Sequence, residues 1–276
     1  MSHKSINIKH LTAVFLLATG LISVNAVVAE DIKVAFPDRY MFRLGSYFVD
    51  QATTDFTILS NAGIGGGVSF KDDLGGEDTD TIPRIDAYYR FNNKHRIDFT
   101  LFTVDRPGSK TLTVDLTIGD ETFFANDTIV SDIKYNVYKL DYAYSFYHSP
   151  EVELSLLAGL SFTSYDLSYS LDSGGRADSS DVTAPLPMFG LSMGYAINSN
   201  WSLHYTSESF FIELNDSIKG ALLNYQLDIE YKLFQNFSIG LGVSRFSTDV
   251  EIKNGDWKGS IQDSRRGVLL FGALYF

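Results

Sequence analysis

Residues 221–243 read ALLNYQLDIEYKLFQNFSIGLGV, and this stretch decides the fold. Between Leu223 and Leu233 apolar residues occupy every odd position, and polar or charged residues occupy every even one. This period of two is typical of a strand with one apolar face and one polar face. After a tight turn at Gln235-Asn236 the pattern resumes, with apolar residues opposite serines and glycines. A soluble sandwich rarely carries two such unbroken rows, whereas a transmembrane β-barrel requires both.

The first residues have the pattern of an export signal. Lys4 and Lys9 precede an apolar run from Leu11 to Val24, and Val27-Val28-Ala29 follows. This order predicts a secretory signal peptide that is cut after Ala29. A transmembrane helix is the alternative, but the run is shorter than the roughly 20 residues that span a bilayer. We therefore expect residues 1–29 to be removed and residues 30–276 to form one barrel domain.

The composition disfavours some classes of binding partner and excludes some kinds of chemistry. Asp and Glu total 34 against 22 Lys and Arg, and the formal net charge of −12 disfavours nucleic acid as a partner. The chain has no cysteine, which excludes a disulfide framework and a thiol site. Its 21 Phe and 16 Tyr are sufficient for the aromatic girdles that a membrane barrel needs.

The same alternation marks further strands along the chain. We predict an all-β, up-and-down antiparallel barrel of ten strands, within a range of eight to twelve, because bacterial barrels of one chain have an even number. The predicted strands begin near residues 40, 81, 95, 134, 151, 186, 201, 221, 237 and 266. Pairing of residues 54–61 with 66–71 as an additional hairpin would make twelve. Two polar stretches are predicted to be extracellular: Asp105–Val130 as a hairpin that rises above the membrane, and Asp166–Ala184 as a long loop.

The chain resembles a known group of proteins. Its signal peptide, its alternating strands and its final Leu274-Tyr275-Phe276 are similar to those of small Gram-negative outer-membrane β-barrel proteins, including the membrane domain of outer-membrane protein A-like porins. The resemblance covers residues 38–276 and is architectural. It implies an outer-membrane location, contact with lipid and lipopolysaccharide, and recognition of the terminal Phe276 by the barrel assembly machinery. No peptidoglycan-binding domain follows the barrel, so the resemblance does not imply anchoring to the cell wall.

Charged and polar side chains are expected on the inward face of several strands. The predicted lumen residues are Arg84, Asp86, Arg90, Asp98, Lys139, Asp141, Glu153, His204, Glu208, Asp228, Glu230 and Lys232. They could set the selectivity of a pore. They could instead pair with one another and fill a narrow lumen, in which unpaired charges are costly. Ten strands enclose little room once side chains are placed, and this favours the filled lumen.

Two clusters have a catalytic or metal-binding interpretation. His204 and Glu208 lie near Ser207, and a histidine held by a carboxylate beside a hydroxyl activates a nucleophile. Ser207, however, is three residues from His204 and points to the other face of the strand, which disfavours a hydrolase. The acidic stretch Asp72–Asp80 offers oxygen ligands for calcium but lacks the spacing of a calcium loop. We therefore predict no catalytic residues, no metal and no cofactor.

These patterns together predict a monomeric outer-membrane β-barrel that is not an enzyme and that has a structural role or forms a narrow passive channel. The alternative functions are a small-solute porin, a barrel-bound lipid hydrolase, and a surface receptor or adhesin that acts through the outer loops.

Overall fold

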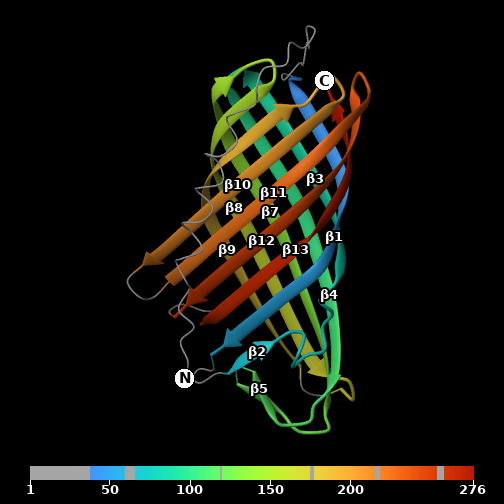
Figure 1. The fold of residues 1–276 in the computed structure, drawn as a ribbon. Coiled ribbons are helices and arrows are strands. Elements are labelled where there is room, and N and C mark those ends of the chain that lie inside the picture. Colours follow the sequence, from blue (N-terminus) through green and yellow to red (C-terminus); the bar gives the residue numbers. More distant parts are fainter. Residues whose placement is uncertain (1–37, 60–65, 119, 175–176, 215–217, 254–257) are drawn as a thin grey trace. The chain divides into compact units, whose positions relative to one another are not determined.

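The computed structural model describes residues 38–59, 66–118, 120–174, 177–214, 218–253 and 258–276. The predicted signal peptide, residues 1–29, lies outside the described residues. Within the described part, ten long strands form the barrel wall (Figure 1). They are β1 (Tyr40–Ile58), β3 (Asp80–Asn92), β4 (His95–Thr111), β7 (Thr128–His148), β8 (Val152–Leu171), β9 (Ala177–Ala196), β10 (Trp201–Leu214), β11 (Ile218–Phe234), β12 (Phe237–Ile252) and β13 (Gly259–Tyr275). Three short strands accompany them: β2 (Gly67–Ser69), β5 (Leu116–Ile118) and β6 (Glu121–Phe123).

The ten strands follow one another around the wall in chain order, and β13 pairs with β1 to close it. The closing ladder runs antiparallel from Met41↔Tyr275 to Ile58↔Gly259. The predicted fold class and the count of ten strands are therefore confirmed. The twelve-strand alternative is wrong, because the stretch up to Ile58 continues β1 and only the three residues of β2 pair with it.

The hairpin that decided the fold is β11–β12, which turns at residues 235–236 as predicted. Turns of a few residues also join β3 to β4, β7 to β8, and β9 to β10 at the same end of the barrel. Short turns are typical of the periplasmic end of outer-membrane barrels. We call this end inner and the opposite end outer. Among the described residues, no helix is long and apolar enough to cross a bilayer.

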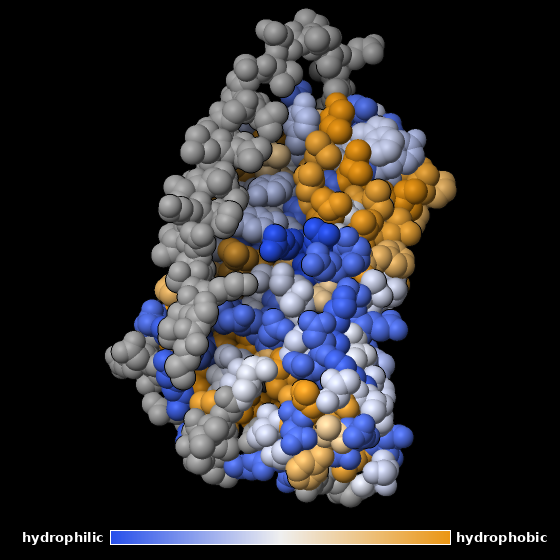
Figure 2. All heavy atoms as spheres, turned by 60° about the horizontal axis from the view of Figure 1, so that its bottom comes forward, coloured by the Kyte–Doolittle hydropathy of each residue, from blue (hydrophilic) through white to orange (hydrophobic). Residues whose placement is uncertain are grey.

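Each wall strand changes polarity along its length. In the inner half of β12, Ile239, Leu241 and Val243 are exposed on the outside of the barrel. Further out along the same strand the outside carries Arg245, and Phe246 is buried inside. The outward apolar side chains of the inner half form a lipid-facing band, as a transmembrane barrel requires. Figure 2 shows apolar residues gathered mainly at one end of the visible face and hydrophilic residues over much of the rest.

The predicted hairpin Asp105–Val130 is present as extensions of β4 and β7, and the predicted loop Asp166–Ala184 is mostly strand. β4 continues to Thr111 and β7 begins at Thr128, while only residues 172–176 separate β8 from β9. In these extensions the outside is polar because it meets water, and the inside is apolar because it packs into a core. The polar outward residues gave the stretches the composition of loops, although the period of two persists.

The outer half of the barrel encloses an apolar core. Ile133, Tyr135 and Val137 of β7 are buried in it, as are Tyr165 and Leu167 of β8. The segment 67–79, which links β1 to β3, contributes the fully buried Phe70 and Leu74, and the β5–β6 hairpin contributes Ile118 and Phe123. Hydrogen bonds to the wall hold segment 67–79 in place, with Phe70 N donating to Thr54 O at 2.9 Å and Ala52 N donating to Asp78 O at 2.7 Å.

Candidate functional site

A polar cavity of about 260 Å³ occupies the inner half of the lumen. It extends from Asp38 and Tyr275 near the inner end to Thr100 and Asn224 further out. Eleven of the twelve predicted lumen residues line this cavity: Arg84, Asp86, Arg90, Asp98, Lys139, Asp141, Glu153, His204, Asp228, Glu230 and Lys232. Glu208, the twelfth, is buried beside the cavity in contact with Lys139. The strand pleat places these residues inside because they alternate with the lipid-facing apolar row.

One ion-pair group joins β1 to β11 across the lumen. Arg43 Nη1 lies 2.8 Å from Asp228 Oδ2, and Arg43 Nη2 lies 3.5 Å from Glu230 Oε2. The Tyr275 hydroxyl donates a hydrogen bond of 2.6 Å to Glu230 Oε1. The Arg43 guanidinium also lies 3.8 Å from the centre of the Phe271 ring, a cation–π contact. Because β12 and β13 separate β11 from β1 in the wall, these contacts cross the interior.

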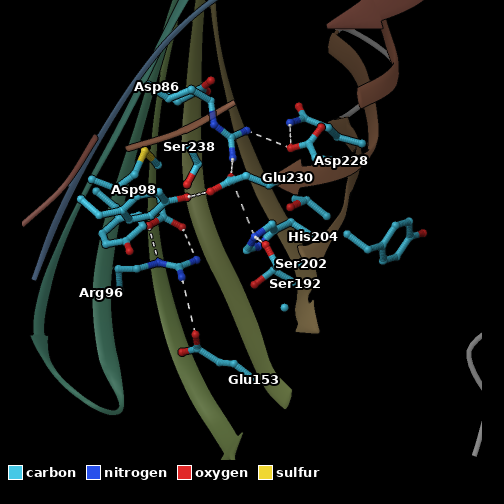
Figure 3. Close-up of a pocket in the computed structure, with 18 of the residues that line it drawn as sticks. Asp86, Arg96, Asp98, Glu153, Ser192, Ser202, His204, Asp228, Glu230 and Ser238 are labelled. Atoms are coloured by element: carbon cyan, nitrogen blue, oxygen red, sulfur yellow. Dashed lines mark hydrogen bonds and ion pairs between the residues drawn. The ribbon is translucent and has the colours of Figure 1, made fainter. Parts of the chain in front are cut away.

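A second group joins β3 and β4 to β8. Arg90 donates two hydrogen bonds to the Glu153 carboxylate, at 2.7 and 2.9 Å, which is the bidentate geometry of a strong ion pair. Arg96 binds the Asp98 carboxylate at 2.6 and 2.8 Å, and its Nη1 lies 3.9 Å from Glu153 Oε2. Figure 3 shows Arg96 between Asp98 and Glu153.

A third group joins β7 to β10. Lys139 Nζ lies 2.5 Å from Glu208 Oε2 and 3.1 Å from Asp141 Oδ2, so one cation serves two buried carboxylates. The Asn224 amide donates a further hydrogen bond of 2.7 Å to Glu208. A neighbouring pair, Arg84 and Asp86, lies 2.8 Å apart on β3. The three groups therefore link strands that are not neighbours in the wall by charge-assisted hydrogen bonds.

The set of lumen residues predicted from the sequence leaves out two members of this network, Arg43 and Arg96. Both alternate with outward apolar residues, Arg43 between Phe42 and Leu44 and Arg96 before Ile97. That alternation is the signal that identified the other lumen residues, and it would have found these two. Two further buried arginines, Arg106 and Arg265, lie in the outer half beyond the cavity. Arg265 is paired with Asp263, and Arg106 donates to Thr54 Oγ1 at 2.8 Å.

The residues that surround His204 in the structure differ from those considered in the sequence analysis, which were Ser207 and Glu208. Glu208 binds Lys139, and Ser207 alternates with the inward residues of β10. The hydroxyl near His204 is that of Ser202, whose Oγ lies 3.1 Å from His204 Nε2 (Figure 3). Glu230 Oε2 lies 4.0 Å from the same nitrogen. A catalytic triad places the serine and the acid on opposite ring nitrogens, and these two approach the same one.

The acidic stretch at the outer end makes local bonds. Asp73 Oδ2 accepts a hydrogen bond of 2.7 Å from Ser69 N, and Asp80 Oδ1 accepts one of 2.6 Å from Thr81 N. Lys71 donates a hydrogen bond to Asp78, and this lowers the pKa of the Asp78 carboxyl below its ordinary value. In the part of the chain that the structure describes, no three histidine or acidic side chains gather into a metal-binding group.

No protein-family model matches the chain, and no curated protein matches its sequence. Solved structures do match. The outer-membrane protease OmpT from Escherichia coli is 12% identical at a TM-score of 0.54, over 87% of this chain and 98% of that chain. OprG from Pseudomonas aeruginosa is 14% identical at a TM-score of 0.38, over 89% of this chain and 100% of that chain. Ail from Yersinia pestis is 12% identical at a TM-score of 0.36, over 84% of this chain and 97% of that chain.

At these identities the likeness shows the fold alone, and the likeness to OmpT carries it. The lipid-facing band and the closed ring of ten strands within the described residues agree with that fold. The chain is therefore an outer-membrane β-barrel protein, and it is located in the outer membrane.

Proposed function

We propose that the protein is a filled outer-membrane barrel with a structural role, and that it does not conduct solutes steadily. The observation that carries this proposal is the apolar core that occupies the lumen beyond the charged cavity. An ion that entered the cavity from the periplasm would have to pass Val137 and Leu269, and then Phe70 and Leu74. Tightly packed apolar side chains are a barrier to ions because they cannot replace the ions' water of hydration.

The charged cavity supports the same proposal from the inner side. Its cations and carboxylates are paired, at 2.8 Å for Arg43 and Asp228, 2.7 Å for Arg90 and Glu153, and 2.5 Å for Lys139 and Glu208. Paired side chains link strands that are not neighbours in the wall and leave little fixed charge to attract one sign of ion. We infer a mechanical role for these pairs, as braces of the barrel, rather than a role as a selectivity filter.

We also propose that the protein is not an enzyme, that it is a monomer, and that its partners are outer-membrane lipid, lipopolysaccharide and the barrel assembly machinery. Ser202 and Glu230 both lie near the same nitrogen of His204, and this supports the proposal that the protein is not an enzyme. The exposed apolar band supports contact with lipid. Assembly through the terminal Phe276 rests on the resemblance in the sequence.

Conductance in planar bilayers tests the proposal. The unaltered protein should give no steady current. The double variant Phe70→Ala/Leu74→Ala removes two buried side chains of the seal and should give measurable leakage. Val114→Ala is the matched control, because Val114 is exposed at the same end of the barrel, and it should remain silent. Large, stable, ion-selective currents from the unaltered protein would contradict the filled lumen and favour a porin.

A further inference from the structure

The wall of the barrel is interrupted between β9 and β10. Their ladder runs from Ser202↔Ala196 to Ser209↔Phe189 and ends there, although β9 extends outward to Ala177 and β10 to Leu214. Over the same length β9 stays paired with β8, and β10 stays paired with β11. Figure 1 shows the outer end of β10 at the lower left, with its partner β11 and then β12 beside it on one side. We call the stretch beyond Phe189↔Ser209 the seam.

The wall has a second interruption, between β3 and β4, but there another segment of the chain covers the free strand edge. The seam differs from it in this respect. The β3–β4 ladder ends at Arg84↔Phe102, and β4 continues outward without β3. Segment 67–79 covers that edge through the bridge Gly76↔Gly108 and a hydrogen bond from Arg106 to Glu77 O. Gly108 has no Cβ, and a Cβ there would lie 2.7 Å from Leu74 O, so the segment can approach the strand closely.

Two prolines keep β9 from pairing along the seam. Pro185 and Pro187 lie opposite Phe162 and Leu160 in the β8–β9 ladder, which continues through both positions. Proline has no N–H to donate and is found on the free edges of sheets. Because the β8 side remains paired, the missing donors belong to the edge that faces β10. The edge of β9 therefore lacks two of the donors that would extend the ladder beyond Phe189.

Apolar side chains flank the seam on both sides of the wall, on the outside of the barrel and on the inside. Phe189 and Phe211 are 59% and 62% exposed on the outer surface, and the Phe189 and Phe210 rings lie 6.4 Å apart across the strands. Behind the seam, Leu186 and Met188 of β9 are buried in a small core that is separate from the main one. The other members of this small core are Leu222, Phe246 and Val250. A Cβ on Gly220 would lie 3.1 Å from Leu186 Cδ2, so β9 closes directly on β11 there.

We propose that the seam is a lateral binding site for an acyl chain of an outer-leaflet lipid. The nature of the ligand follows from the position of the seam next to the lipid-facing band. Phe189 and Leu191 belong to this band, and Leu186 follows them on the same strand, β9. Hydrocarbon that already covers the band can enter the seam without leaving an apolar environment. The Glu213–Lys219 ion pair of 2.8 Å lies just beyond Phe211, where a lipid headgroup would meet polar groups.

Single-cysteine labelling tests this site cleanly, because the chain has no cysteine of its own. Leu186→Cys places a thiol behind the seam, and Leu157→Cys places an equally buried one on β8 at the level of the lipid-facing band, where the wall is paired on both sides. The purified variants are reconstituted in phosphatidylethanolamine vesicles that contain a lipid with a maleimide on one acyl chain. Leu186→Cys should react about tenfold faster than Leu157→Cys, because a seam needs less local opening than a paired wall.

Proline replacement provides a second, independent arm. In the Leu186→Cys background, Pro185→Thr/Pro187→Thr restores two donors to the β9 edge and should slow labelling toward the Leu157→Cys rate. Pro83→Thr, on β3, is the control and should leave the rate unchanged. Heat-modifiable gel mobility verifies that each variant is folded. Labelling of Leu186→Cys no faster than that of Leu157→Cys overturns the proposal. Faster reaction with a charged, water-soluble maleimide than with the lipid also overturns it, because the seam would then be an aqueous slit.

Discussion

Removing the Lys139 charge should be among the most damaging single changes in the lumen. The Lys139 Nζ atom lies 2.5 Å from Glu208 Oε2 and 3.1 Å from Asp141 Oδ2, and both carboxylates are almost completely buried. Lys139→Met keeps a long side chain but leaves two carboxylates near each other without their cation. Loss of one partner of a buried ion pair costs about 3–5 kcal/mol, and the second stranded carboxylate places Lys139→Met at the upper end of that range.

Arg90→Met is the matched comparison and should cost less. Its partner Glu153 would keep the Arg96 guanidinium at 3.9 Å, so the carboxylate would not be left without a cation. We expect this variant at the lower end of the same range, about 3 kcal/mol. The order of the two losses therefore depends on the contacts of each remaining acid and not on the number of charges removed.

The assay is guanidinium unfolding of the protein in lipid vesicles, from which the free energy of unfolding is obtained. Adding Glu208→Gln to Lys139→Met removes one of the two stranded charges and should restore part of the loss. A smaller loss for Lys139→Met than for Arg90→Met would refute the reasoning, as would the absence of any rescue by Glu208→Gln. Either result would mean that water reaches these groups and screens them.

Three further predictions concern facing, topology and assembly. Leu227→Arg places a cation on the lipid-facing band and should lower the free energy of unfolding by about 2–4 kcal/mol if it lies near the midplane. Gln226→Arg points into the polar cavity and should lower it much less. Equal losses would contradict the assigned facing of these two residues. Ser173→Cys, in the outer turn after β8, should react with an impermeant maleimide on intact cells; labelling that requires permeabilised cells would mean that the topology is inverted. Deletion of Phe276 should lower the amount of heat-modifiable barrel in the outer membrane, and an unchanged amount would exclude a role for this residue in assembly.

The fold was predictable because, in the inner half of the barrel, outward apolar residues alternate with inward polar or small ones. Hairpin β11–β12 shows both of its faces in sequence, and its turn at residues 235–236 could be read directly. The outer half could not be read in the same way, because the outward residues of β7 there are Asp132, Lys134 and Asn136. A search for outward apolar residues misses such strands, although Ile133 and Tyr135 preserve the alternation on the inside.

The lumen network was predictable in its members but not in its pairs. Alternation indicates that Arg43 and Asp228 face inward, yet it cannot show that they meet. Which residues face each other across a barrel depends on the stagger of the strands around the whole ring. The seam has a partial sequence signal in Pro185 and Pro187, which mark a free edge. The end of the ladder at Phe189↔Ser209 became visible only when the neighbours of β9 were known.

The opposite polarity of the two halves follows from what surrounds each of them. Around the lipid-facing band, apolar side chains gain nothing by pointing inward, since hydrocarbon already covers them, and the interior is left to polar groups that must pair. Beyond the band the surroundings are water, so apolar burial can be gained only inside. β1 shows how the chain makes this change. Its register shifts between Val49 and Gln51. Without that extra residue the pleat would turn Asp55 into the apolar core and Phe56 toward water, whereas with it Phe56 is buried and Asp55 is exposed. The bulge therefore reconciles one continuous strand with two environments.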